Sequence, residues 1–193
     1  MKKEGDVSNC LRVGMVLLLG VLLGSCATPQ TVRTGVEWGF EPNAIRVNLT
    51  ADSGLNFYEG TPHTVVVWVY QLTNPNKFNQ LADERTGLTK LLEGGQFDPT
   101  VGDFKREFVQ PGRTVSMTLD RAEGAKYVAV VAGYYALQKE NSTRLVQIPV
   151  VEVTQGNVLV SKPARIRLDV YLGPQSIQKA DVTPQEGQQP GRK

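Results

Sequence analysis

The stretch TVVVWVYQL, residues 64–72, decides the fold class, because it is a strand sequence that is apolar on both faces. β-Branched and aromatic residues fill it, and such residues favour strands. A strand with two apolar faces has to be covered on both sides, as the central strand of a packed sheet is. The stretch KYVAVVAGYY, residues 126–135, has the same character. The sequence therefore predicts two central strands.

Other segments of the chain alternate apolar and polar residues with a period of two. They are AIRVNLTA (44–51), TVSMTL (114–119) and ARIRLDVYL (164–172). This alternation is typical of strands with one face on a core and one face in water. The segment RLVQIPVVEV (144–153) predicts another strand, in which Pro149 favours an edge position or a bulge.

One segment, NPNKFNQLADERTGLTKLLEGG (74–95), has its apolar residues at helical spacing instead. An Asn-Pro pair can begin this helical insertion and a Gly-Gly pair can end it, while Gly87 is expected to divide it into two shorter helices. We expect it to cover the outer face of residues 64–72. Many strands with one helical excursion predict a mainly β fold, a two-sheet antiparallel β-sandwich.

The N-terminus has the organisation of a secretory signal, here residues 1–25. A charged start precedes an apolar run over residues 13–23, and small residues follow. The run is too short to cross a bilayer, which takes about 20 apolar residues. Its end resembles the bacterial lipobox, which implies that the next residue, a cysteine, becomes the lipidated start of the mature chain. An ordinary signal peptide with a chance cysteine is the alternative. The lipobox residues are Leu23, Gly24 and Ser25, and the cysteine is Cys26.

The remaining chain divides by composition into a tether, a domain and a tail. Residues 26–36 are small and polar after the lipidated cysteine, and residues 37–173 hold the predicted strands. Residues 174–193 are rich in Gln, Pro and Gly, so we expect a disordered tail. Cys10 leaves with the signal, so the mature domain is expected to have no disulfide. In lipoproteins of enteric-type bacteria, an Asp directly after the lipidated cysteine tends to retain the protein at the inner membrane. This position is Ala27 here, which indicates the outer membrane.

The composition and motifs indicate neither catalysis nor nucleic-acid binding. The net charge is only +2 and no basic stripe is present. The single histidine, His63, lacks the companions of a usual metal site, and no phosphate loop, dinucleotide fingerprint or zinc signature occurs. We therefore expect no catalytic residue, no metal and no cofactor. Tyr134 and Tyr135 could stack on a ligand, although tyrosines that end a strand more often belong to a core or an interface.

The loops of such a domain are the expected carriers of function. The longest irregular loop before the helical insertion is DSGLNFYEGTPHT, residues 52–64, which contains Phe57 and Tyr58. Aromatic residues on a constrained loop suit protein recognition, because they bury a large area at a modest entropy cost. The alternative, a plain connection whose aromatic residues fold back onto the core, is left open by the sequence.

Several of these features, taken in order, resemble the TssJ/VasD family, the outer-membrane lipoproteins of type VI secretion systems. The strand at 65–72 ends in Tyr-Gln-Leu, as it does in that family. Trp68 stands where the family commonly has an arginine, and the family's Trp-Arg pair after the aromatic strand is not found. The other matching residues are Leu55, Asn56, Gly60, Pro62, Phe78, Ala82, Asp83, Glu107, Pro111, Gly112 and the stretch 126–137.

The resemblance implies a transthyretin-like β-sandwich held at the inner leaflet of the outer membrane. Its partner would be the periplasmic C-terminal domain of TssM, with TssL in the same membrane complex. In the family, the loop between the first two strands contacts TssM, and this loop corresponds to residues 52–63. Asn56, Phe57, Tyr58 and Glu59 are the expected contacts, with Gly54, Gly60 and Pro62 shaping the loop. The full predicted partner-binding loop comprises Asp52, Gly54, Leu55, Asn56, Phe57, Tyr58, Glu59, Gly60, Thr61, Pro62 and His63.

Three other functions remain open at this point. A lipid-anchored periplasmic carrier of the same fold would bind a small ligand or a peptide in a concave apolar pocket. A lipid-anchored hydrolase would need residues that converge only in space. A pilotin-like assembly factor would serve another secretion system.

Overall fold

The structure, a computed structural model, describes residues 35–155 and 158–185. The predicted signal peptide, the lipobox with Cys26 and most of the tether lie outside the described residues. None of the helices within the described ranges is long and apolar enough to cross a membrane.

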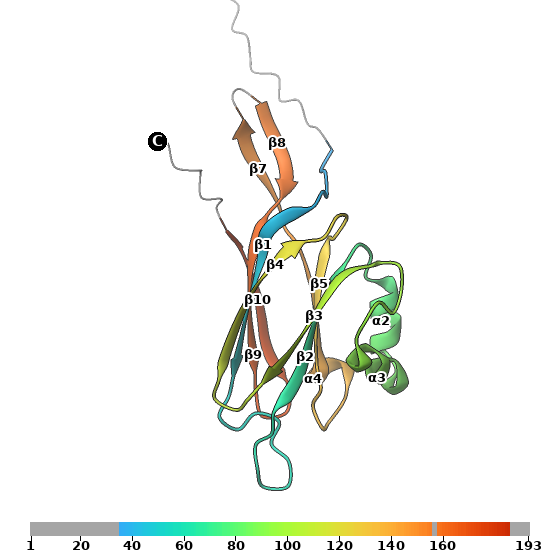
Figure 1. Cartoon of the computed structure of the whole chain (residues 1–193), viewed down its shortest axis with the longest axis vertical. Coiled ribbons are helices and arrows are strands. Elements are labelled where there is room, and N and C mark those ends of the chain that lie inside the picture. Colours follow the sequence, from blue (N-terminus) through green and yellow to red (C-terminus); the bar gives the residue numbers. More distant parts are fainter. Residues whose placement is uncertain (1–34, 156–157, 186–193) are drawn as a thin grey trace, which may run out of the picture.

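The domain is a sandwich of two four-stranded sheets (Figure 1), which confirms the predicted fold class. One sheet has the strand order β10-β9-β1-β4 and the other the order β3-β2-β5-β6. All neighbouring strands are antiparallel except β1 and β9, which run parallel. The strands are β1 (Glu41–Ala51), β2 (Val65–Leu72), β3 (Val101–Val109), β4 (Thr114–Arg121), β5 (Tyr127–Ala132), β6 (Thr143–Gln147), β9 (Arg165–Leu172) and β10 (Ile177–Gln185).

The main core lies between the two sheets, where the inward-facing residues of the strands meet. In β1 the predicted alternation holds, since every second side chain from Ile45 onward is buried. β2 supplies the facing layer of the second sheet. The central buried side chains of the two strands are Ile45, Val47 and Leu49 in β1 and Val65, Val67 and Val69 in β2.

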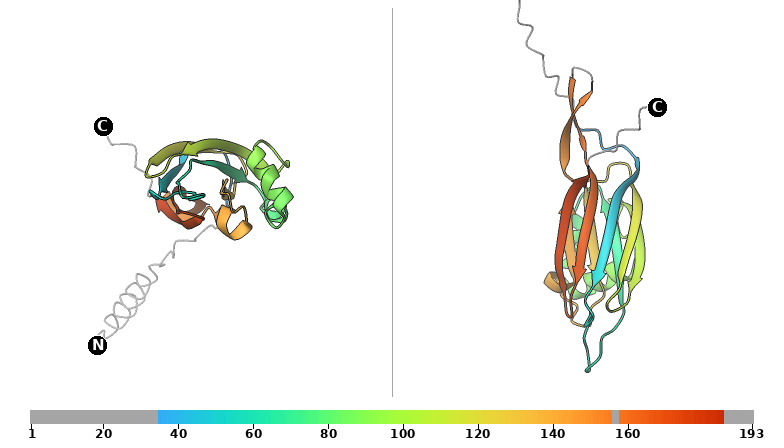
Figure 2. Two further views of the ribbon diagram at one scale, coloured as in Figure 1. Left: turned by 90° about the horizontal axis from the view of Figure 1, so that it is seen from below. Right: turned by 90° about the vertical axis from the view of Figure 1, so that its left-hand side faces the viewer.

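The helical insertion forms two helices, α2 (Asn76–Ala82) and α3 (Arg85–Glu93), which pack on the outer face of β2. Figure 2 shows them along one side of the sandwich. Two aromatic donors of β2 satisfy carbonyls in the last turn of α3: Trp68 Nε1 donates to Leu92 O at 3.0 Å and the Tyr70 hydroxyl to Leu91 O at 2.6 Å. This cover explains why β2 is apolar on both faces.

The helices do not divide at Gly87, as the sequence suggested. The break falls between α2 and α3, and Gly87 lies inside α3. A Cβ atom at Gly87 would come within 2.1 Å of the carbonyl oxygen of Leu81. The glycine therefore permits close packing of the two helices, and it does not interrupt either of them. A short helix, α4 (Lys139–Ser142), follows later in the chain.

The segment 144–153, predicted as one strand, is divided between two. β6 ends at Gln147, and after Pro149 a new strand, β7 (Val150–Gln155), pairs with β8 (Val158–Pro163) in a separate two-stranded sheet. This hairpin projects from one end of the sandwich (Figure 1). Pro149 lacks a backbone N–H and cannot continue the ladder, so the chain leaves the sheet at this point.

The prediction of a disordered tail from residue 174 is wrong for Ile177–Gln185, because these residues form β10, which pairs with β9. A register shift between Ile177 and Lys179 marks a bulge. The bulge changes the phase of the alternation, so Ile177, Ala180 and Val182 all pack against the core. A fixed period of two does not reveal this strand. The edge position of β10 also tolerates Pro184.

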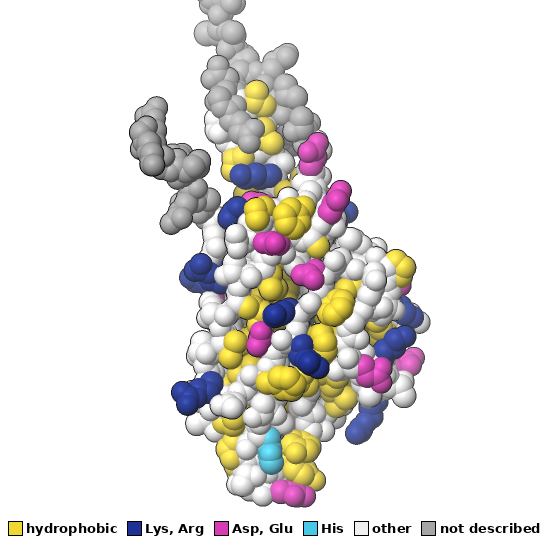
Figure 3. Space-filling view, in the orientation of Figure 1, with side chains coloured by type: hydrophobic (Ala, Val, Ile, Leu, Met, Phe, Trp, Pro, Cys, Tyr) yellow, Lys and Arg dark blue, Asp and Glu magenta, His cyan; other side chains and the backbone are white. Residues whose placement is uncertain are grey.

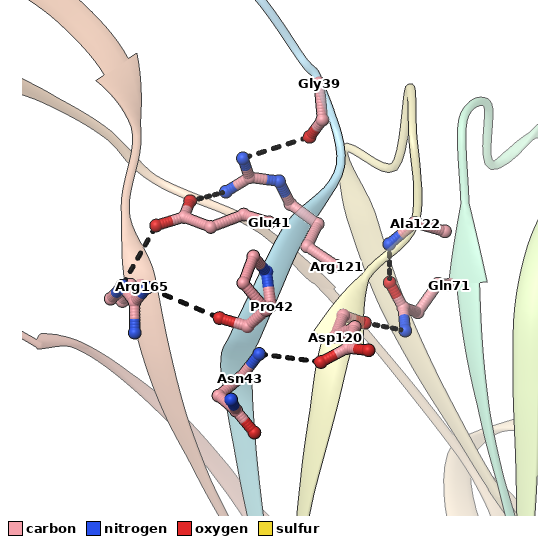
Figure 4. A network of polar contacts seen from close by, with 9 residues as sticks. All are labelled: Gly39, Glu41, Pro42, Asn43, Gln71, Asp120, Arg121, Ala122 and Arg165. Carbon is pink, nitrogen blue, oxygen red and sulfur yellow. Dashed lines mark hydrogen bonds and ion pairs between the residues drawn. The ribbon is translucent and has the colours of Figure 1, made fainter.

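A polar network ties the start of β1 to its neighbours at the hairpin end of the sandwich (Figure 4). Glu41 lies between two cations: its Oε2 atom is 3.0 Å from Nη1 of the buried Arg121, and its Oε1 atom accepts a hydrogen bond from Arg165 Nε at 2.9 Å. Arg121 also donates to Gly39 O at 3.2 Å. These contacts hold the chain where it enters the domain.

Gln71 links the two sheets within the same network. This fully buried side chain donates from Nε2 to Asp120 O at 2.7 Å and accepts from Ala122 N at 2.8 Å. Gln71→Ala is expected to lower the free energy of unfolding by about 1–3 kcal/mol, because it removes the side-chain partner of two partly buried backbone groups, Asp120 O and Ala122 N–H. Urea denaturation checks this. Gln147→Ala, at an exposed position, is the control and should stay within about 0.5 kcal/mol of wild type. Equal effects of the two substitutions would contradict the assigned role of Gln71.

Candidate functional site

The loop between β1 and β2, residues 52–64, projects from the end of the sandwich opposite the β7–β8 hairpin (Figures 1 and 2). Asp52 anchors its first part. The Asp52 backbone N–H donates to Leu172 O at 2.8 Å, and its carboxylate accepts from Gly54 N at 2.7 Å and from the Tyr171 hydroxyl at 3.0 Å. The hydrogen bond to this carboxylate, together with its negative charge, raises the pKa of Tyr171. The loop therefore leaves the sandwich in one defined direction.

Two residues of the predicted partner-binding loop point into the domain. Leu55 is fully buried in the main core, and the side chain of Asn56 is also buried. Asn56 Oδ1 accepts a hydrogen bond from the backbone N–H of Tyr135 at 3.0 Å. The backbone of Asn56 has φ +48°, a left-handed conformation that Asn tolerates better than most residues. These two residues shape the loop from the inside.

The tip of the loop is a tight turn at Tyr58–Thr61. The backbone N–H groups of Tyr58 and Thr61 each donate to the other's carbonyl oxygen, both at 3.0 Å. The two central residues, Glu59 and Gly60, have φ +46° and +81°, the signs of a type I′ turn. His63 braces the turn, because its Nε2 atom lies 3.1 Å from Thr61 Oγ1 and 3.3 Å from Tyr58 O. The tip is thus preformed and carries the exposed Glu59 carboxylate.

Exposed aromatic rings gather beside this turn. The rings of Tyr58 and Tyr135 stack with centroids 4.3 Å apart, and His63 meets Tyr135 edge-on at 5.2 Å. Tyr58 is 45% exposed, Tyr135 54% and Phe57 47%. We call Phe57, Tyr58, His63 and Tyr135 the tip cluster. Phe57 and Tyr58 therefore do not fold back onto the core, which answers the question that the sequence left open.

A shallow hollow of about 340 Å³ lies between the loop, the segment after β5 and the turn between β9 and β10. The Phe57 backbone N–H donates to Pro174 O at 2.8 Å, which holds the loop against that turn. Burial raises the pKa of the neighbouring Tyr134 hydroxyl, while the charge of Arg144 acts in the opposite direction. The lining residues are Asn56, Phe57, Tyr58, Tyr134, Tyr135, Ala136, Pro174 and Gln175.

The contact between Tyr135 and the loop is not predictable from the sequence. The tyrosine pair at 134–135 was visible as a possible interface feature, but it lies 79 residues from Asn56 along the chain. Only the packing of β5 beside β2 brings the two segments to the same end of the sandwich. The stacked ring of Tyr135 completes the tip cluster.

The site has the chemistry of a recognition surface. Within residues 35–155 and 158–185, no group of three or more His, Cys, Asp and Glu side chains could hold a metal ion. The tip offers instead exposed aromatic rings, a rigid turn and one carboxylate. Such a set buries apolar area at a small entropy cost when a protein docks on it.

Asn56→Ala is expected to lower the free energy of unfolding by about 2–3 kcal/mol. The substitution leaves the Tyr135 N–H without its acceptor, and alanine disfavours a positive φ. Asn56→Asp keeps an acceptor oxygen and tolerates this backbone conformation, so it should cost less than about 1 kcal/mol. Thermal denaturation of both variants checks the difference. An alanine variant as stable as the aspartate variant would contradict the role given to Asn56.

A family model matches the chain, and solved structures share its fold. A family model described as "Type VI secretion lipoprotein, VasD, EvfM, TssJ" matches residues 43–171. A chain in the solved structure of the T6SS protein TssM C-terminal domain from EAEC is 18% identical with a TM-score of 0.52, covering 72% of this chain and 97% of that one. A chain of a type VI membrane complex is 18% identical with a TM-score of 0.50, covering 79% of this chain and 100% of that one. These two likenesses show the shared fold.

A third solved structure, the T6SS lipoprotein TssJ1 from Pseudomonas aeruginosa, is 19% identical to this chain. Its TM-score is 0.49, and the match covers 75% of this chain and 97% of that one. A comparison with curated protein sequences finds no match.

Proposed function

The chain belongs to the family of type VI secretion lipoproteins, and we propose that it anchors the envelope-spanning secretion complex at the outer membrane. In this proposal Cys26 carries the lipid, and the β1–β2 loop binds the periplasmic C-terminal domain of TssM, which shares the complex with TssL. The protein then acts as a tether between the outer membrane and the rest of the complex, and not as an enzyme.

The observation that carries this proposal is the position of the loop relative to the entry of the chain. The first described residues lie at the hairpin end, and the loop projects from the opposite end (Figure 1). The residues between Cys26 and Gly35 span at most about 30 Å when fully extended. A lipid on Cys26 would therefore keep the hairpin end near the bilayer and direct the tip cluster away from it, toward a periplasmic partner.

The tip cluster has the properties of a binding hot spot, the small set of residues that contributes most of the binding free energy of an interface. Three of its four rings are about half exposed, and the type I′ turn holds Tyr58 in place before any partner arrives. Aromatic residues are enriched among the few positions that dominate binding. Preorganisation adds to affinity, because little conformational freedom remains to be lost.

The test is a direct binding measurement. Protein from residue 27 onward, which retains the whole described domain, is titrated with the TssM periplasmic domain of the same organism in a calorimeter. We expect a one-site complex with a dissociation constant of about 1 μM or tighter, within the range of specific protein complexes. A folded domain that shows no binding would contradict the proposal, and a ligand co-purifying with it would then favour the periplasmic carrier.

A further inference from the structure

β3 carries an exposed row of side chains that the proposed loop contact does not use. Among the described strands it is an edge strand, and it pairs with β2 alone. Phe104, Arg106 and Phe108 occupy alternate positions and so share the outer face of the strand. Phe104 is 40% exposed and Phe108 60%. We call these three residues the β3 stripe, and Figure 3 shows hydrophobic and basic side chains together on the face that β3 crosses.

The guanidinium of Arg106 is positioned between aromatic rings. Its Cζ atom lies 5.5 Å from the centroid of the Trp68 ring and 5.3 Å from that of Phe108, which are cation–π distances. Among the described residues, no carboxylate lies within ion-pair distance of Arg106. An exposed arginine whose planar guanidinium is already oriented is suited to bind a carboxylate of another molecule, because its N–H groups can donate to both carboxylate oxygens.

The β3 stripe ends at the same end of the sandwich as the tip cluster. The register of β2 and β3 places Phe108 opposite Val66, at the loop end of the sheet. The Val66 carbonyl accepts a hydrogen bond from Gly133 N at 2.9 Å, and the chain reaches Tyr135 two residues later. Helix α3 packs on β2 and β5, while Phe104, Arg106 and Phe108 on β3 are exposed. One partner can therefore touch both surfaces.

We propose that the partner surface extends from the tip cluster along β3, where the β3 stripe receives a segment of the same partner that carries a carboxylate between apolar side chains. This inference rests on the proposed function, because the occupant is the protein bound at the loop. The unpaired charge of Arg106 selects an acidic residue, and the flanking phenylalanines select apolar neighbours on either side of it.

Arg106→Glu tests the inference against a matched control, Lys105→Glu. Both substitutions replace a positive charge by a negative one, so they change the net charge equally. The two residues are adjacent on β3 and both are exposed, but their side chains face opposite sides of the strand. Arg106→Glu is expected to weaken binding of the TssM periplasmic domain at least about tenfold, and Lys105→Glu by less than about threefold. Phe108→Ser, which leaves the charge unchanged, should also weaken binding about tenfold. Circular dichroism and melting curves show whether each variant is folded.

The outcomes separate this inference from the proposed function. Equal affinities of the Arg106→Glu and Lys105→Glu variants, with wild-type binding intact, would overturn the role of the β3 stripe and leave the loop contact standing. A wild-type domain that does not bind the partner at all would contradict the proposed function itself. A large loss confined to Arg106→Glu and Phe108→Ser supports the extended surface.

Discussion

A variant with Phe57→Ser and Tyr58→Ser is expected to bind the TssM periplasmic domain at least about 100-fold more weakly than wild type. Aromatic residues at the centre of an interface contribute about 2–4 kcal/mol each when they are truncated, and the two effects are not fully additive. The substitution also removes the ring that stacks on Tyr135 at 4.3 Å. Binding is measured by titration calorimetry with both proteins purified.

This double variant is a sharper test than replacement of the whole loop. Leu55 and Asn56 are buried and support the fold, so a swap that removes them changes stability as well as the surface. The matched control is Phe40→Ser, because Phe40 is 62% exposed but lies next to the start of β1, at the opposite end of the domain. We expect wild-type affinity for this control. Unchanged affinity of the double variant would rule out the tip cluster as the contact.

Gly94→Ala is expected to lower the free energy of unfolding by about 3–5 kcal/mol. Gly94 ends α3 with φ +81° and ψ 179°, a region that is almost exclusive to glycine and costs other residues about 1–3 kcal/mol. A Cβ atom there would also come within 2.0 Å of the Trp68 ring, which is held in place by its hydrogen bond to Leu92 O. Relieving this overlap costs about 1–3 kcal/mol more.

The neighbouring glycine provides the control for this second prediction. Gly95 also has a positive φ, +91°, but nothing lies within 4 Å of a Cβ atom built on it. Gly95→Ala should therefore cost only the backbone term, about 1–2 kcal/mol. Gly94→Ala should lower the melting temperature by about 10 °C, and Gly95→Ala by less than half as much. Thermal denaturation of the two variants and the wild type measures these shifts. Equal losses would mean that the contact with Trp68 carries no cost.

The strands and the helices were largely predictable, because their signals are local. β2 is apolar on both faces since one face meets β1 and the other meets α2 and α3, and both requirements are written into the same short stretch. The glycine pair that ends α3 was visible for the same reason. The role of Trp68 was not, because its hydrogen-bond acceptor, Leu92, lies 24 residues away.

Two parts of the fold escaped prediction for identifiable physical reasons. The bulge in β10 changes which residues face the core, so a strand whose inward positions are Ile177, Ala180 and Val182 does not show a simple alternation. The division of the segment 144–153 depends on whether the chain continues along β5 or leaves it at Pro149. Local propensity does not distinguish these two paths.

The sequence by itself determined the fold class, the lipobox pattern and the presence of two aromatic residues in the β1–β2 loop, because each depends on residues that are close together in the chain. The tertiary structure decided that these two aromatic residues are exposed. Only the tertiary structure decided that Tyr135 stacks on Tyr58 and that Phe108 lies at the same end of the domain. It also decided that Asn56 faces inward, toward Tyr135. These relations depend on the register and order of strands that are distant in sequence, and side-chain composition does not specify them.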